Sequence, residues 1–238
     1  MREGYEAYRN RIHSFVENQA CFPPTCEPFC TAPGLVQKFD ADGHFQKFYG
    51  DTTVFPLSKE TQNALEGYQL ALYNTGAHML SEPLPAETFH ITLHDLCAAG
   101  DKASIEKLIL GHKQKLKPVL PALCQKGKFR LRSAGIVSMV ASSVVMLFEP
   151  ASEADHQVIQ DIYGVIDSIV PLSYPLTLHC TLAYYRPGTY ASHEWNPLLE
   201  AVRRLNQSGP VEIELDCSAL EYQEFGSMKE YKGFIGNL

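Results

Sequence analysis

The sequence predicts a mixed fold of helices and strands that is built from two copies of one unit. Two segments carry this prediction, FHITLHDL at 89–96 and LTLHCTLAYY at 176–185. Each alternates apolar and more polar side chains, as a half-buried strand does. Each also places His-x-Thr on its less apolar face and follows a segment with helical spacing. The same order of helix and strand therefore occurs twice.

The whole chain can be assigned to elements without a long linker between them. Ser58 is a good N-cap for a helix, and Asp42-Gly43 and Gly50-Asp51 are turn signals between short strands. β-Branched residues interrupted near Ala141 are typical of a hairpin. The predicted order is a helix over 4–18, short strands over 35–57, a helix over 58–80, a strand over 89–96, a helix over 102–116, a hairpin over 128–148, a helix over 152–170, a strand over 176–185, a helix over 194–205 and strands to the C-terminus.

Composition limits the function classes. The chain has 238 residues, 45% of them hydrophobic, which is typical of a globular protein with a substantial core. Its formal charge of −7 argues against a protein that coats duplex nucleic acid but leaves a small nucleotide as a partner. The N-terminus lacks an apolar signal segment, and no run approaches the roughly 18 apolar residues that a membrane span needs. We expect a cytoplasmic protein that binds no membrane.

The seven cysteines indicate free thiols rather than a disulfide framework, because they are odd in number and scattered. Three of them, Cys21, Cys26 and Cys30, cluster in a proline-rich loop, but their spacings of five and four do not match a zinc knuckle. Cys180 lies between His179 and Thr181, and strand alternation predicts that it is a small core residue instead of a nucleophile. No metal site and no cofactor are expected.

The two His-x-Thr segments suit phosphoester chemistry. Attack on a phosphate needs a base for the incoming oxygen and an acid for the leaving oxygen, and histidine can serve as either near neutral pH. If the two strands lie side by side, His90 and His179 supply both roles. Thr92 and Thr181 point the same way as the histidines, and their hydroxyls can donate to phosphate oxygens whose charge grows in the transition state.

Paired His-x-Thr motifs about ninety residues apart on strands resemble the two-histidine (2H) phosphoesterase superfamily, which includes LigT-like RNA-processing enzymes and cyclic phosphodiesterases. The stretch GLVQKFDADGHFQKFYGDTTVF, from Gly34, is also similar to the opening of a largely uncharacterised bacterial branch. The resemblance implies an α+β, bilobal fold of two pseudo-symmetric units, each an antiparallel sheet with helices outside, and a groove between them. We expect residues 1–33 to form an N-terminal helix and loop and residues 34–238 to form a single domain.

The same resemblance assigns site residues by motif position. His90 and His179 take the catalytic roles, and Thr92 and Thr181 bind phosphate. Aromatic residues after the second motif fall where such enzymes contact substrate, and strand alternation selects Tyr185 over Tyr184 as the one that faces the groove. Alternation also turns His94 toward the groove, either as a substrate contact or as a rim residue bonded to a neighbouring strand.

Three functions are consistent with these observations. The favoured one is a metal-independent phosphodiesterase for a small nucleotide, such as a 2′,3′-cyclic phosphate or a related cyclic compound or oligonucleotide. The alternatives are a non-catalytic nucleotide-binding module that uses the same groove, and a metal-dependent hydrolase. Lys38 and Arg186 are candidates for holding a second phosphate or a ribose, and Arg130 and Arg132 either line the groove or cover an outer surface of the sheet.

Overall fold

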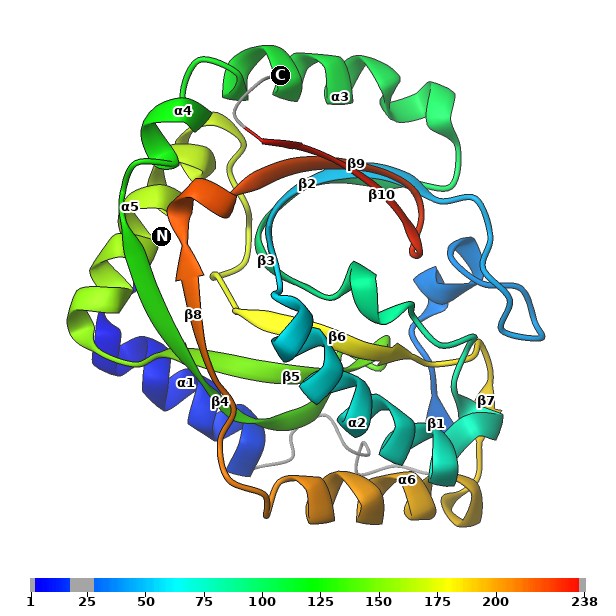
Figure 1. The fold of residues 1–238 in the computed structure, drawn as a ribbon. Coiled ribbons are helices and arrows are strands. Elements are labelled where there is room, and N and C mark those ends of the chain that lie inside the picture. The colour runs from blue at the N-terminus through cyan, green and yellow to red at the C-terminus, as the bar shows by residue number, and fades with distance from the viewer. Residues whose placement is uncertain (1–2, 18–27, 236–238) are drawn as a thin grey trace.

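The structure, a computed structural model, describes residues 3–17 and 28–235 and confirms the predicted α+β class (Figure 1). The strands within these ranges form two four-stranded antiparallel sheets and a short two-stranded pair. In chain order the elements are α1 (Tyr5–Glu17), β1 (Phe29–Cys30), η1 (Pro33–Gln37), β2 (Tyr49–Pro56), α2 (Lys59–Gly76), η2 (Ala77–Met79), η3 (Ala86–Thr88), β3 (His90–Ala99), α3 (Lys102–Leu116), α4 (Leu120–Leu123), β4 (Lys128–Met139), β5 (Ser143–Pro150), α5 (Glu153–Ile169), β6 (His179–Tyr184), β7 (Thr189–Tyr190), α6 (Ser192–Leu205), β8 (Glu212–Asp216), η4 (Cys217–Ala219), β9 (Glu221–Ser227) and β10 (Glu230–Ile235).

The predicted duplication is visible in the connections between strands. The first sheet has the order β10-β9-β2-β3 and the second β6-β5-β4-β8. In the first, α2 links β2 to β3, and in the second, α5 links β5 to β6. Each linking helix leads into a strand that carries His-x-Thr and forms the edge of its sheet. Strands β3 and β6 also contact each other, so the two motif-bearing edges meet in the middle of the molecule (Figure 1).

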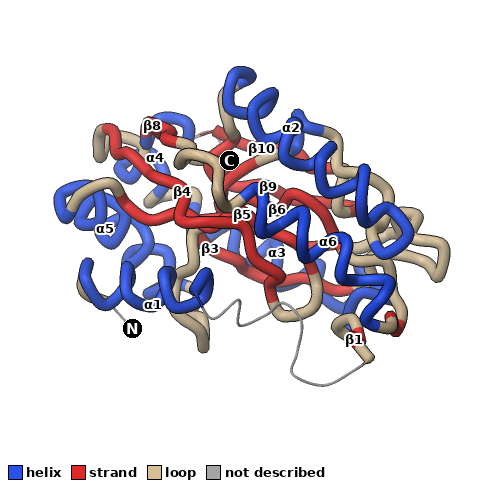
Figure 2. The backbone as a smooth tube through the Cα atoms, turned by 90° about the horizontal axis from the view of Figure 1, so that it is seen from below, coloured by secondary structure: helices blue, strands red, loops and turns tan. Residues whose placement is uncertain are grey.

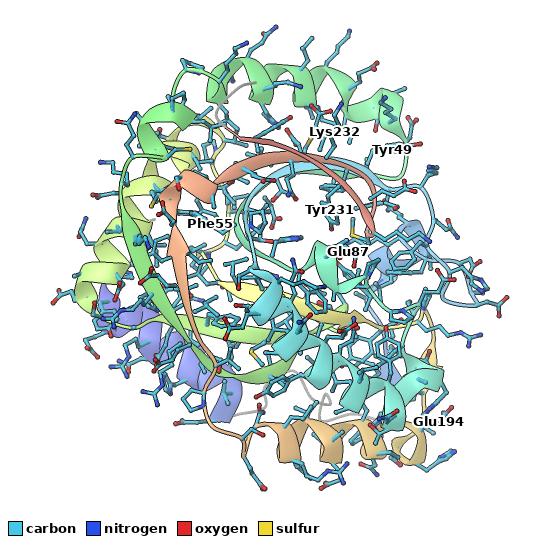
Figure 3. All side chains as sticks on the ribbon, viewed as in Figure 1. Tyr49, Phe55, Glu87, Glu194, Tyr231 and Lys232 are labelled. Carbon is cyan, nitrogen blue, oxygen red and sulfur yellow. The ribbon has the colours of Figure 1, made fainter. Side chains whose placement is uncertain are left out.

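The sheets share one hydrophobic core. Every residue of β5 is buried, which is why its sequence is a continuous apolar and β-branched run rather than an alternating one. Phe55 on β2, labelled in Figure 3, is almost fully buried. Its ring meets that of Phe129 on β4 edge to face, with centroids 5.2 Å apart, and Phe129 is also almost fully buried. This pair connects the apolar faces of the two sheets.

The helices cover the sheets and also exchange contacts between the two halves. Helix α3 packs on β2 and β3, and α1 packs on β4 and β5. Helix α2 belongs to the first half but contacts β6 and lies beside α6, and α5 belongs to the second half but contacts β3 (Figures 1 and 2). Each linking helix therefore touches the motif-bearing strand of the other half. Ser58 caps α2 as predicted, accepting from the Thr61 amide at 3.2 Å.

The expectation of short strands throughout 35–57 is wrong for its first part. Pro33 begins the 3₁₀ helix η1, since its fixed φ suits the first position of a helical turn. The turn at Asp42-Gly43 is present, with φ of +85° at Gly43, but Gly50-Asp51 lies inside β2. Gly50 is required there for space: a Cβ would lie 2.3 Å from both the Cys97 carbonyl oxygen and the Phe225 ring.

The cysteine predictions are tested only in part. Cys21 and Cys26 lie outside the described residues, while Cys30 is exposed on β1. Cys180 is buried at 1% exposure, as strand alternation predicts. Within residues 3–17 and 28–235, no helix has both the length and the apolar character that crossing a membrane requires.

Candidate active site

The two predicted motifs lie in one groove. His90, Thr92, His179 and Thr181 all line a cavity of about 760 Å³ where β3 and β6 meet. A volume of this size lies within the range of small-molecule sites. All four side chains are partly exposed, whereas the residues between them, Ile91 and Cys180, are buried. Alternation along each strand thus turns the histidine and the threonine toward the cavity.

Both histidine rings are held by the same contact. Nδ1 of His90 lies 2.7 Å from the carbonyl oxygen of Thr88, and Nδ1 of His179 lies 2.8 Å from that of Thr177. A carbonyl oxygen can only accept, so each Nδ1 carries a hydrogen and donates it to the residue two positions earlier. Each Nε2 is left to exchange a proton with a bound molecule. The second half therefore reproduces not only the motif but also the orientation of its imidazole.

The surroundings of His90 favour its neutral form. Burial is the main cause that lowers the pKa of His90 to about 4; the imidazole of His179 acts in the same direction, and the bond to Thr88 acts in the opposite direction. At neutral pH His90 consequently presents an unprotonated Nε2, which is the state that a general base needs.

A β-bulge follows each motif at the same position and re-aims the residues beyond it. On β3, Thr92 pairs with Val54 and His94 with Thr53, so Leu93 is the extra residue. On β6, Thr181 pairs with Val145 and Ala183 with Val144, so Leu182 is the extra residue. An inserted residue reverses the alternation of the side chains that follow it.

The bulge at Leu182 overturns the prediction that Tyr185 faces the groove. Tyr185 has 0% exposure and packs edge to face on Phe29, with centroids 5.0 Å apart. Tyr184 lines the groove instead, and its hydroxyl donates to Sδ of Met228 at 3.4 Å. Strict period-two counting from His179 selected the wrong tyrosine because it allowed for no bulge.

The bulge at Leu93 also corrects the placement of His94. This residue lies in the wall of the cavity, but its side chain has no exposed surface and is packed against α5. Its Nδ1 donates to the Asp95 carbonyl, its Nε2 lies 3.4 Å from Asp167, and its ring contacts that of Tyr163. Both nitrogens are occupied by protein groups. His94 therefore joins the two halves and is neither the exposed groove residue nor the rim residue that alternation suggested.

Helix α1 holds the segment that leads into the second motif. The Tyr8 hydroxyl accepts from the Leu178 amide and donates to the Phe148 carbonyl, both at 3.0 Å. Arg11 donates to the Thr177 hydroxyl at 3.0 Å and to the Leu176 carbonyl at 2.7 Å. These contacts fix the three residues immediately before His179, including the one whose carbonyl orients its ring. No local sequence pattern marks this role, because Arg11 on α1 and Thr177 next to β6 are more than 160 residues apart.

Aromatic side chains from β9 and β10 complete the wall beside the first motif. Tyr231 meets His90 edge to face, with centroids 5.2 Å apart, and its other neighbour is Phe225 at 5.5 Å. Figure 3 shows Tyr231 on the inner side of the sheet and the next residue, Lys232, on the outer side. Burial raises the pKa of Tyr231 well above its usual range, so the hydroxyl stays protonated and can donate. No motif in the sequence marks Tyr231, which lies far beyond the second His-x-Thr.

One cluster outside the motifs has side chains that could hold a metal ion. Donor atoms of Asp51, Cys97 and His112 lie within 4.8 Å of one another. The Asp51 carboxylate already accepts from His112 Nδ1 at 2.9 Å, from Tyr222 at 3.1 Å, and from the amide and thiol of Cys97. Desolvation and the adjacent carboxylate raise the pKa of the Cys97 thiol to about 12, so it stays protonated in this arrangement. The cluster fastens α3 to β2 and β3 by hydrogen bonds.

No protein-family model matches the sequence, and no curated protein matches it. Among solved structures, the chain is similar to a conserved protein of unknown function from Agrobacterium tumefaciens, at 18% identity and a TM-score of 0.62, over 86% of this chain and 92% of that one. It is also similar to apo LigT from E. coli, at 14% identity and a TM-score of 0.45, over 79% of this chain and 96% of that one. Usb1 from Kluyveromyces marxianus with uridine monophosphate gives 12% identity and a TM-score of 0.44, over 82% of this chain and 99% of that one. The likeness to the Agrobacterium protein shows a shared fold over most of both chains.

Proposed function

We propose that this protein is a metal-independent 2H-type phosphodiesterase that opens a small nucleotide cyclic phosphate. The observation that carries the proposal is the pair of imidazoles in one groove, each fixed through Nδ1 by the carbonyl two residues earlier. Two rings held in the same way in the lining of one cavity can act on opposite sides of one phosphorus atom. Thr92 and Thr181 lie beside them in the same cavity.

The surroundings of the two histidines suggest how they divide the work. His90, whose pKa is lowered to about 4, is neutral at pH 7 and takes a proton from the attacking water through Nε2. The oxygen of that water bonds to phosphorus, and the bond from phosphorus to one ribose oxygen of the cyclic phosphate breaks. His179, in its protonated form, donates from Nε2 to that leaving oxygen. The net reaction consumes one water and yields a nucleoside monophosphate.

The threonines stabilise the charge that develops during this reaction. As phosphorus becomes five-coordinate, negative charge grows on the two non-bridging oxygens. A hydroxyl from each motif can donate to these oxygens, in a cavity partly withdrawn from water where such bonds are stronger. The hydroxyl of the partly buried Tyr231, which stays protonated, is a third donor beside His90.

The test is a turnover screen with the purified protein in excess EDTA. Nucleoside 2′,3′-cyclic phosphates are the first substrates, followed by 3′,5′-cyclic nucleotides, cyclic dinucleotides, short oligoadenylates and ADP-ribose cyclic phosphate. We expect turnover of at least one of these, and we expect its loss in both His90→Ala and His179→Ala. Turnover that stops with EDTA and returns with zinc or manganese would instead support a metal-dependent hydrolase. Binding without turnover in any condition would support a nucleotide-binding module.

A further inference from the structure

One of the charged side chains that line the groove has neither an ion pair nor a side-chain hydrogen bond among the described residues. Four charged side chains line the cavity: Arg11, Lys38, Asp51 and Asp95. Arg11 is paired with Glu3 at 2.7 Å, Asp51 accepts from His112, and Asp95 accepts from the Tyr174 hydroxyl at 2.8 Å. Within residues 3–17 and 28–235, Lys38 forms neither an ion pair nor a side-chain hydrogen bond.

The ammonium of Lys38 is held between two aromatic rings. Its Nζ lies 5.2 Å from the ring centroid of Phe48 and 5.1 Å from that of Tyr184. Cation–π contacts of this kind orient a lysine but do not neutralise its charge. The backbone is fixed on both sides, since the Lys38 amide donates to Leu35 and its carbonyl accepts from Gln46 at 2.8 Å. The side chain therefore starts from an ordered turn and ends in a partly apolar wall.

The position of Lys38 separates it from the reacting phosphate. Tyr184, on whose ring it lies, comes three residues after Thr181, which is about 10 Å or less along a strand. Lys38 thus lies past the second His-x-Thr motif in the direction of β6. An anionic group bound by Lys38 is therefore a different group of the ligand from the reacting phosphate.

We propose that Lys38 binds a second phosphate of the substrate, so that the enzyme prefers a nucleoside 2′,3′-cyclic phosphate that also carries a 5′-phosphate. The placement of the cyclic phosphate at the two histidines rests on the proposed function. The position of the Lys38 ammonium in the groove does not depend on it. An ammonium that is partly withdrawn from water attracts a phosphate more strongly than an exposed one. Arg186, the other basic candidate from the sequence, is engaged with Asp42 and the Ala41 carbonyl and takes no part in this site.

The experiment compares two ligands that differ only in the 5′-phosphate. Binding of adenosine 3′-monophosphate and of adenosine 3′,5′-bisphosphate is measured by titration calorimetry at low salt. The proteins are the parent, Lys38→Met, which removes the charge but keeps the length, and Lys38→Arg, which keeps the charge. Lys229→Met is the matched control, because Lys229 also lies over an aromatic ring, Phe45, but is near Glu82 and outside this groove. Turnover of adenosine 2′,3′-cyclic phosphate with and without a 5′-phosphate is measured in parallel.

We expect the parent to bind the bisphosphate about 10-fold more tightly than the monophosphate, which corresponds to one favourable charge contact. Lys38→Met should lose this preference while binding the monophosphate nearly as before, and Lys38→Arg and Lys229→Met should keep it. High salt should reduce the preference. The inference would be wrong if the parent bound both ligands equally well, or if Lys38→Met weakened the binding of both ligands by the same factor. If the parent prefers the bisphosphate but turns over no substrate, the proposed enzymatic function is wrong and the Lys38 phosphate site stands. If the parent turns over substrate but shows no preference for the bisphosphate, the Lys38 site is wrong and the proposed function stands.

Discussion

The two motif-bearing strands, β3 and β6, are alike where they meet the proposed phosphate and different where they meet the rest of the protein. Both carry His-x-Thr-Leu, both hold Nδ1 of the histidine on the carbonyl two residues earlier, and both have a bulge at the leucine. The likeness therefore extends to the backbone hydrogen bonds around each motif. Such repetition is expected if both halves must present the same two groups to one ligand.

Beyond the bulges, the two strands are fastened by different chemistry at equivalent places. Gln69 on α2 donates to the carbonyl of Leu182, the bulge residue of β6, at 2.9 Å. On β3, the residue after the bulge is His94, which contacts Asp167 and Tyr163 on α5. Each linking helix thus holds the other half's strand at its bulge, once through an amide and once through an imidazole and a carboxylate. The side chains that hold each strand at its bulge therefore differ between the halves, whereas the histidine and threonine of the motif are the same in both.

The strands also differ in what lies around their histidines. Helix α1 hydrogen-bonds to the residues just before His179, whereas the segment before His90 packs on α2, and the His90 ring meets Tyr231. This difference accompanies the unequal roles that we propose, a base on β3 and an acid on β6. The predictions that follow test whether the halves are alike in chemistry and unlike in support.

The largest effects should come from the histidines themselves. His90→Ala and His179→Ala should each lower kcat by about 10²- to 10⁴-fold, the range for loss of one general acid or base. Steady-state turnover at pH 7 in EDTA measures both. His44→Ala is the control, since His44 is exposed and pairs with Asp40 away from the groove. If one histidine variant retained full activity, the two strands would not be equivalent in chemistry.

The pH profile should separate the two histidines. His90 must be neutral to act as a base, and its pKa is lowered, so activity should persist as the pH falls below 6.5 and decline only toward about 4. The profile of kcat/KM should be bell-shaped, with limbs that belong to the coupled pair. His90→Ala should remove the acidic limb and His179→Ala the alkaline one. An acidic limb at pH 6.5 or above in the parent would contradict the assignment of His90 as the base.

The threonines should have smaller and similar effects. Thr92→Ala and Thr181→Ala should each reduce kcat by about 10- to 10³-fold, because each removes one hydroxyl donor from the transition state. Both limbs of the pH profile should remain, since a threonine hydroxyl does not titrate in this range. If only one threonine mattered, the phosphate would be held by one half and the symmetry of the site would be superficial.

The support of β6 by α1 should show as a loss of stability with a modest loss of activity. Tyr8→Phe leaves the Leu178 amide and the Phe148 carbonyl without their bonds to the hydroxyl, which should cost about 1–3 kcal/mol in urea unfolding. We expect kcat to fall by several-fold with the pH limbs in place. Tyr73→Phe is the matched control, because Tyr73 donates to the Ser81 carbonyl outside the groove. It should lower stability without changing kcat, and an equal loss of activity in both variants would remove the special role of α1.

The smallest effect on rate should come from His94. His94→Ala removes a buried contact between the halves, so stability should fall by about 1–3 kcal/mol while kcat stays within a few-fold of the parent. Activity and urea unfolding are measured on the same preparation. If His94→Ala abolished turnover in a folded protein while His179→Ala did not, chemistry would reside on β3 alone.

The sequence predicted those parts of the site that depend on local periodicity and repetition. His-x-Thr on two alternating strands was enough to place His90, Thr92, His179 and Thr181 in one cavity. The positions just after the motifs could not be placed, because a bulge depends on pairing with the neighbouring strand. The bulge at Leu182 turns Tyr184 instead of Tyr185 toward the groove, and the bulge at Leu93 buries His94. Contacts from distant segments, such as Tyr231 and Arg11, left no local pattern in the sequence.

The most direct test of the account is a crystal structure with adenosine 2′- or 3′-monophosphate, the products expected from a cyclic phosphate. The account predicts one phosphate between the two strands, with Nε2 of His90 and of His179 within hydrogen-bond distance on opposite sides and both threonine hydroxyls on its oxygens. A phosphate that contacted only one of the two histidines, or that bound away from β3 and β6, would contradict it.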